Sequence, residues 1–77
     1  IISRTISLRT FESHIAESLT SVQNKYQNVE IGSYPFFHAG KLGVSIVIRS
    51  DDEKLINECS SEVMKFVNEK KIEIVNR

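Results

Sequence analysis

Two segments of the chain, residues 2–9 and residues 42–49, alternate apolar with polar side chains. A period of two places the apolar residues on one face of a β-strand and leaves the other face polar. Both segments are also rich in β-branched residues, which favour strands. We therefore predict a half-buried strand at each position. The inward-facing side chains of these two strands are Ile2, Ile6, Leu8, Val44, Ile46 and Ile48.

Apolar residues recur at steps of three and four in two other segments, which predicts two amphipathic helices. The first stripe comprises Phe11, Ile15, Leu19, Val22 and Tyr26, and the second comprises Leu55, Ile56, Cys59, Val63, Phe66 and Val67. Thr10 is the expected N-cap of the first helix. Ser50 and Glu53 form a capping box that predicts the start of the second helix.

Two further extended segments, residues 29–37 and 72–75, complete the predicted fold. Pro35 lacks the N–H that a central strand needs, so its segment is expected to form an edge strand. The glycines of residues 38–43 predict a hairpin connection to the strand that follows. The order β-α-β-β-α-β predicts one α+β, ferredoxin-like domain over residues 1–77. It has a four-stranded antiparallel sheet with the first and third strands central and both helices on one face.

Composition narrows the classes of partner. The chain carries ten Lys and Arg residues against ten Asp and Glu, and the balance holds within each half. Binding through phosphate contacts needs clustered Lys and Arg, so this balance argues against a nucleic-acid partner. A single cysteine, Cys59, cannot form an intrachain disulfide and favours a reducing, cytoplasmic location. The apolar runs are far shorter than the ~20 residues of a membrane span, so no membrane partner is expected.

No set of residues in the sequence predicts catalysis, a metal site or a cofactor site. His14 and His38 lack Cys, His or acidic neighbours at ligand spacing, and we interpret them as surface histidines. Cys59 lies in a helix stripe and is interpreted as a small core residue. Gly40 and Gly43 spell GxxG, the loop pattern with which KH domains clamp a nucleic-acid backbone, but a hairpin turn explains both glycines. The central strands also lack the aromatic residues on which RNA-recognition sheets stack bases.

Residues 28–37, N-V-E-I-G-S-Y-P-F-F, lead through a short turn into residues 43–52, G-V-S-I-V-I-R-S-D-D. This region resembles the small KH-type α+β module that follows the molybdopterin-binding-like, nucleotide-binding domain in CinA-related proteins, and the similar domain of eukaryotic-type FAD synthases. The resemblance covers most of the chain, and residues 32–35 are its most specific part. Because the chain begins with Ile1 instead of Met, we also expect it to be a piece of a longer protein.

The resemblance implies a parent protein that handles a nucleotide, as a nucleotide pyrophosphatase or a FAD synthase-like enzyme does. The residues for that chemistry lie in the preceding domain of such proteins. The resemblance therefore assigns no catalytic residue to this chain, which is not itself expected to be an enzyme or to hold a cofactor.

The aromatic part of this region supplies a candidate interface, made of Gly32, Ser33, Tyr34, Pro35, Phe36 and Phe37. A core of this size has no room for three aromatic side chains within four positions, so at least one is expected to be exposed. We expect the segment to contact the rest of the parent chain or a second copy of the protein. The leading hypothesis is an accessory interaction domain of a nucleotide-processing protein. The alternative is a stand-alone module of ferredoxin-like topology that binds a small ligand or nucleic acid.

Overall fold

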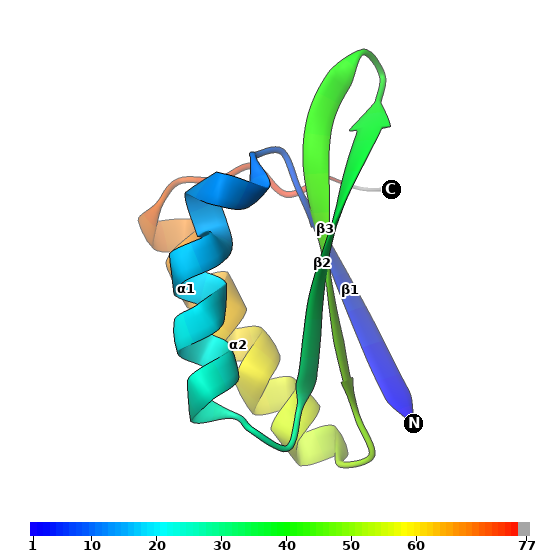
Figure 1. Ribbon diagram of the computed structural model, residues 1–77, viewed down its shortest axis with the longest axis vertical. Helices are drawn as coiled ribbons and strands as arrows, with labels where there is room; N and C mark the ends of the chain where they lie inside the picture. The colour runs from blue at the N-terminus through cyan, green and yellow to red at the C-terminus, as the bar shows by residue number, and fades with distance from the viewer. Residues whose placement is uncertain (76–77) are drawn as a thin grey trace.

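The structure, a computed structural model, describes residues 1–75 as a three-stranded antiparallel sheet with two helices. The elements follow the chain as β1 (Ile2–Leu8), α1 (Glu12–Lys25), β2 (Glu30–His38), β3 (Lys41–Ser50) and α2 (Glu53–Glu69). The strand order is β1-β3-β2, so β3 is central and β1 is not. Both helices cover the same face of the sheet, and the other face is open (Figure 1). The architecture is α+β, but the predicted four-stranded sheet is wrong.

The predicted fourth strand, residues 72–75, forms only an isolated bridge between Ile74 and Leu8. Two backbone hydrogen bonds accompany the bridge, from Arg9 N to Glu73 O at 2.9 Å and from Val75 N to Ser7 O at 2.8 Å. In this antiparallel register Ile72 lies opposite Thr10, beyond the end of β1, so half of the segment has no strand to pair with. Ile74 is 50% exposed, so the alternation of Ile72 and Ile74 does not bury both side chains, and the register leaves no partner for a full strand.

The hydrophobic core fills the space between the helices and the sheet. The predicted inward residues of β3 are fully buried, and so is Leu8 of β1. The registers Ile6↔Ile46 and Ile31↔Ile48 stack inward side chains across the three strands. Both helices contribute the middle of their predicted stripes to this core: Ile15, Leu19, Val22, Ile56, Cys59, Val63, Phe66 and Val67. The faces predicted from the two periodicities are confirmed for these residues.

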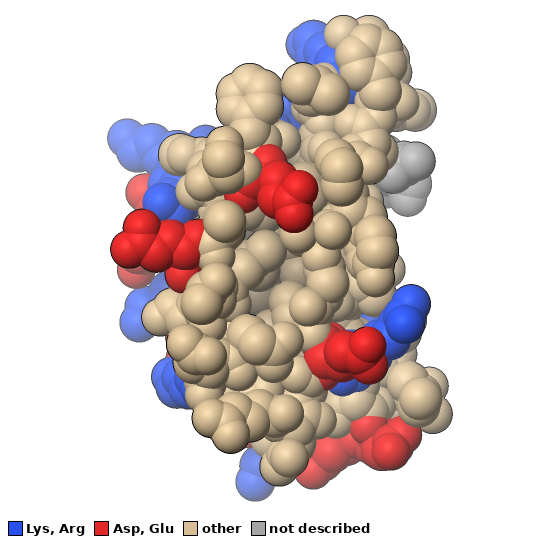
Figure 2. All heavy atoms as spheres, in the orientation of Figure 1, with Lys and Arg blue, Asp and Glu red and all other residues tan. Residues whose placement is uncertain are grey.

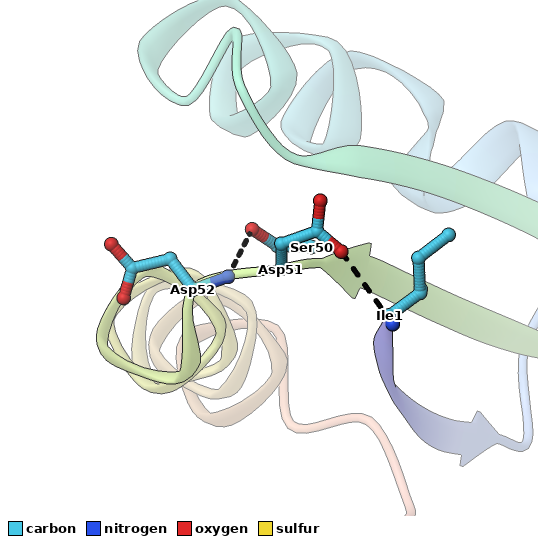
Figure 3. Close-up of polar contacts among 4 residues, drawn as sticks. All are labelled: Ile1, Ser50, Asp51 and Asp52. Atoms are coloured by element: carbon cyan, nitrogen blue, oxygen red, sulfur yellow. Dashed lines mark hydrogen bonds and ion pairs between the residues drawn. The ribbon is translucent and has the colours of Figure 1, made fainter.

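The helix starts differ from those predicted. The N-cap of α1 is Phe11, which has extended backbone angles and provides no capping side chain, so Thr10 is not the cap. The N-cap of α2 is Asp52, whose carboxylate accepts a hydrogen bond from Lys54 N at 2.9 Å. Ser50 Oγ instead accepts a hydrogen bond from Asp52 N at 3.1 Å, one residue too early for a capping box, which would use Glu53 N (Figure 3). Asp51, between them, lies 3.5 Å from the amino group of Ile1 (Figure 3).

The outer edge of β2 is closed by a side chain from α1. Gln23 Oε1 accepts a hydrogen bond from Ile31 N at 3.1 Å, and Gln23 Nε2 donates to Val29 O at 2.6 Å. These are the contacts that a neighbouring strand would make. Pro35 lies further along the same edge strand, as predicted, where its missing N–H removes no bond to β3.

Candidate interface at the β2–β3 hairpin

The β2–β3 hairpin extends beyond the helices that cover the sheet. A two-residue turn joins the strands, in which Ala39 and Gly40 both have positive φ, 55° and 75°. This backbone matches the type I′ turn, whose twist suits an antiparallel hairpin. The nine residues of β2 span about 30 Å at ~3.3 Å per residue, whereas the fourteen residues of α1 span about 21 Å. The tip of the hairpin therefore projects past the helical layer (Figure 1).

Three large apolar side chains are exposed where the hairpin leaves the helices. Phe37 and Leu42 are directly opposed across the two strands, and their exposed fractions are 70% and 52%. Leu42 continues the inward row of Val44 along β3, so Leu42 and its cross-strand neighbour Phe37 both lie on the helix side of the sheet. Phe11, just before α1, is 63% exposed and lines a surface groove together with Phe37 and Leu42. We call these three residues the hairpin patch.

The six residues of the predicted interface do not share one surface. Gly32, Tyr34 and Phe36 face the open side of the sheet, whereas Ser33, Pro35 and Phe37 face the helix side, because side chains alternate along a strand. Of the three aromatic residues, Tyr34 and Phe37 are more than half exposed and Phe36 is partly buried. The side chain of Ser33 is held by α1, since its Oγ donates to Glu12 Oε1 at 2.8 Å.

Two glycines on the open face lie beneath aromatic rings. A Cβ added to Gly43 would collide with the Phe36 ring and lie 2.8 Å from Leu8 O, so no larger residue fits there without movement. A Cβ added to Gly32 would lie 2.9 Å from Tyr34 Oη, at the far end of an exposed side chain. Gly43 is therefore required for close packing across the strand pair, whereas Gly32 is not.

Arg9 connects the turn end of the hairpin to the end of β1. Its Nη1 donates to His38 O at 3.3 Å and to Lys41 O at 3.4 Å, and both distances are long for such bonds. The Nε of Arg9 is buried and has no hydrogen-bond partner in the described part of the chain. Arg9 and Lys41 flank a groove of about 450 Å³ whose walls include the hairpin patch. The upper end of the molecule accordingly shows uncharged and basic surface (Figure 2).

Sequence reasoning missed three residues of this groove. The sequence pattern places Leu42 only at the start of a strand and Phe11 in the buried stripe of a helix, yet both side chains are exposed. The lengths of the predicted strands and helices could have identified Leu42 and Phe11 as exposed, because a strand rises more than twice as far per residue as a helix. Residues near the hairpin turn therefore extend beyond any helix of similar length. No pattern in the sequence indicated that Arg9 would reach the hairpin.

The remaining residues considered from the sequence are His14, His38 and Cys59. His14 and His38 are exposed. Cys59 is buried, and desolvation, followed by the charge of Glu62, raises the pKa of its thiol. Within residues 1–75 no group of His, Cys, Asp and Glu side chains could hold a metal ion. No helix in the same part of the chain is long and apolar enough to span a membrane.

Comparison with known proteins gives one match. A family model described as the middle domain of FAD synthase matches residues 1–76, nearly the whole chain. No curated protein and no solved structure matches it.

Proposed function

Because the chain belongs to the FAD synthase middle-domain family, we propose that it is an accessory domain that docks onto a neighbouring domain of a FAD synthase-like parent through its hairpin patch. The observation that carries this proposal is the exposure of Phe11, Phe37 and Leu42 together at one end of the sheet. Exposed apolar clusters bordered by polar residues are typical of protein interfaces. No step of a reaction is assigned to this chain.

A neighbouring domain suits the size of this surface better than a free partner does. A stable interface between separate proteins buries roughly 1,200 to 2,000 Å² in total. Three side chains and a groove are far smaller than that. A domain joined by a short linker binds at an effective concentration in the millimolar range, so a small patch is sufficient to hold it. The description of the family as a middle domain supports sequence on both sides of this chain.

The test compares Phe37→Ser with Tyr34→Ser in the full-length parent protein. Both residues are exposed aromatics on β2, but they lie on opposite faces of the sheet. We expect Phe37→Ser to loosen the docked domain, measured as faster limited proteolysis of the linkers and a larger radius of gyration in X-ray scattering. Tyr34→Ser should behave like the parent.

The stability of residues 1–77 provides the control for this comparison. Exposed substitutions of this kind change the free energy of unfolding by about 0.5 kcal/mol or less, so neither variant should unfold the domain. If only Tyr34→Ser loosens the protein, docking occurs through the open face. If Phe37→Ser leaves the shape unchanged but dissociates an oligomer in sedimentation, the partner is a second copy. Either result rejects the proposal.

A further inference from the structure

The groove beside the hairpin patch combines apolar walls with two cations and no acidic side chain. Phe11, Phe37 and Leu42 provide the walls, and Arg9 and Lys41 provide the charges. No carboxylate lines the groove, although two lie near it. Glu12 accepts a hydrogen bond from Ser33, and Glu73, whose backbone pairs with that of Arg9, forms no ion pair with it within residues 1–75. Other carboxylates lie along the helices and at the opposite end of the molecule from the hairpin (Figure 2). An occupant that is only apolar would leave both cations without a counter-charge.

Arg9 is incompletely satisfied by the protein itself. Its two hydrogen bonds to backbone carbonyls are 3.3 Å and 3.4 Å long, and its Nε donates to no atom of residues 1–75. A guanidinium prefers a carboxylate, which it can bind with two parallel charge-assisted bonds. Backbone carbonyls offer neither the charge nor this geometry. A small movement of the side chain towards a carboxylate in the groove would replace long bonds with short ones.

From this arrangement we infer that the groove binds a protein segment in which an apolar side chain stands next to a carboxylate, with Arg9 as the residue that selects the carboxylate. The apolar side chain packs on Phe37 and Leu42, and the carboxylate pairs with Arg9 beside Lys41. The inference rests on the proposed function, since it describes the chemistry of the neighbouring domain that docks there. It adds a charge requirement that the apolar patch alone does not impose.

The experiment uses residues 1–77 labelled with ¹⁵N and two peptides that differ in one group. The probes are acetyl-Phe-Glu-Leu-amide and acetyl-Phe-Gln-Leu-amide, titrated at low salt while the backbone and Arg Nε resonances are followed by NMR. We expect the glutamate peptide to bind about tenfold more tightly, which is the value of one good charge-assisted pair. Its shifts should be largest at Arg9 Nε and at the amides of Phe37 and Leu42. Added salt should weaken its binding and leave that of the glutamine peptide nearly unchanged.

Two variants identify the residue that selects the carboxylate. In Arg9→Gln the preference for the glutamate peptide should disappear, whereas in Lys41→Gln, which keeps the Arg9 side chain, most of it should remain. Equal binding of the two peptides to the unaltered chain overturns the inference whether or not the variants fold. A preference that survives Arg9→Gln also overturns it. If Phe37→Ser undocks the parent protein but the peptides bind equally, the proposed function stands and the inference fails. If Phe37→Ser leaves the parent protein docked but the glutamate peptide binds more tightly, only the proposed function is rejected.

Discussion

At the scale of single residues, we expect replacement by alanine to affect the stability differently at the two glycines that lie beneath aromatic rings. In Gly43→Ala the new methyl group meets the Phe36 ring and the Leu8 carbonyl, and the carbonyl cannot move without disturbing β1. We expect a loss of about 1 to 3 kcal/mol in the free energy of unfolding, as for other overpacked sites. In Gly32→Ala only the end of the exposed Tyr34 side chain must move, so the stability should be unchanged or slightly higher.

Urea unfolding of both variants measures this difference. Equal losses in the two variants would contradict the difference in available space above the two glycines.

The ion pair between Lys25 and Glu62 gives the domain a pH dependence at its acidic end. The hydrogen bond from Lys25 Nζ, 2.7 Å from Glu62 Oε1, lowers the pKa of Glu62 below its usual 4.5, and the charge of Lys25 adds to the shift. Glu62 therefore stabilises the fold when pH is above 4.5, and this contribution is lost as the pH falls through the lowered pKa. The side chain of Lys25 is 61% exposed and that of Glu62 is 31% exposed, so salt should reduce the effect.

The variant Glu62→Gln tests this dependence against Glu69→Gln on the same helix. We expect unfolding curves of Glu62→Gln and the unaltered chain to differ at neutral pH and to converge well below pH 4.5. Glu69→Gln removes a carboxylate that forms no ion pair within residues 1–75, and it should change the stability by about 0.5 kcal/mol or less at neutral pH. A constant difference between Glu62→Gln and the unaltered chain across the pH range would mean that Glu62 acts by packing and not by its charge.

At the scale of elements, the start of α2 depends on one carboxylate. Asp52 accepts a hydrogen bond from Lys54 N, so Asp52→Ala should cost about 0.5 to 2 kcal/mol, the usual value of an N-cap. Glu53→Ala, which removes the side chain that a capping box needs, should cost little, because no capping box is formed there. Urea unfolding followed by circular dichroism at helical wavelengths measures both variants. A larger loss in Glu53→Ala than in Asp52→Ala would support the capping box predicted from the sequence.

Helices and strands were predictable from the sequence where the hydrophobic pattern within the segment itself determines them. Alternation identified β1 and β3, and the stripes of Ile15 and Val63 identified the buried faces of α1 and α2, because burial imposes those periods directly. The ends of the elements were less predictable, since Phe11 fits the helix spacing but lies outside the helix. The fate of residues 72–75 depended on register, which places Ile74 opposite the last residue of β1. Register is a property of two segments together and leaves no trace in either one alone.

The candidate interface was only half predictable for the same reason. A dense aromatic segment indicated that some ring must be exposed, and Phe37 is. Its neighbours in space, Phe11 and Leu42, come from other segments and were identified only once the hairpin was seen to extend beyond the helices. The contact between Arg9 and the hairpin carbonyls depends on the same three-dimensional arrangement.

At the scale of the whole molecule, one core links every element, so the domain should unfold as a unit. Ile46 lies at its centre on β3 and is fully buried, and Ile46→Ala should cost about 2 to 5 kcal/mol. Ile74→Ala, at a residue 50% exposed, should change the stability by about 0.5 kcal/mol or less. Near- and far-ultraviolet circular dichroism should report the same midpoint in each variant. A normal melting curve for Ile46→Ala would contradict the core described here.

The contact between Gln23 and β2 also bears on how the protein behaves when it is concentrated. A free strand edge is a template on which identical chains can add strand to strand and grow into fibrils. Residues 31, 33, 35 and 37 direct their main-chain groups away from β3, but Gln23 occupies the N–H of Ile31, and Pro35 has none. Every second outward-facing backbone N–H along this edge is therefore unavailable to an incoming chain. The glutamine and the proline together make β2 a poor nucleus for aggregation, so the domain can remain dispersed although its hairpin exposes apolar side chains.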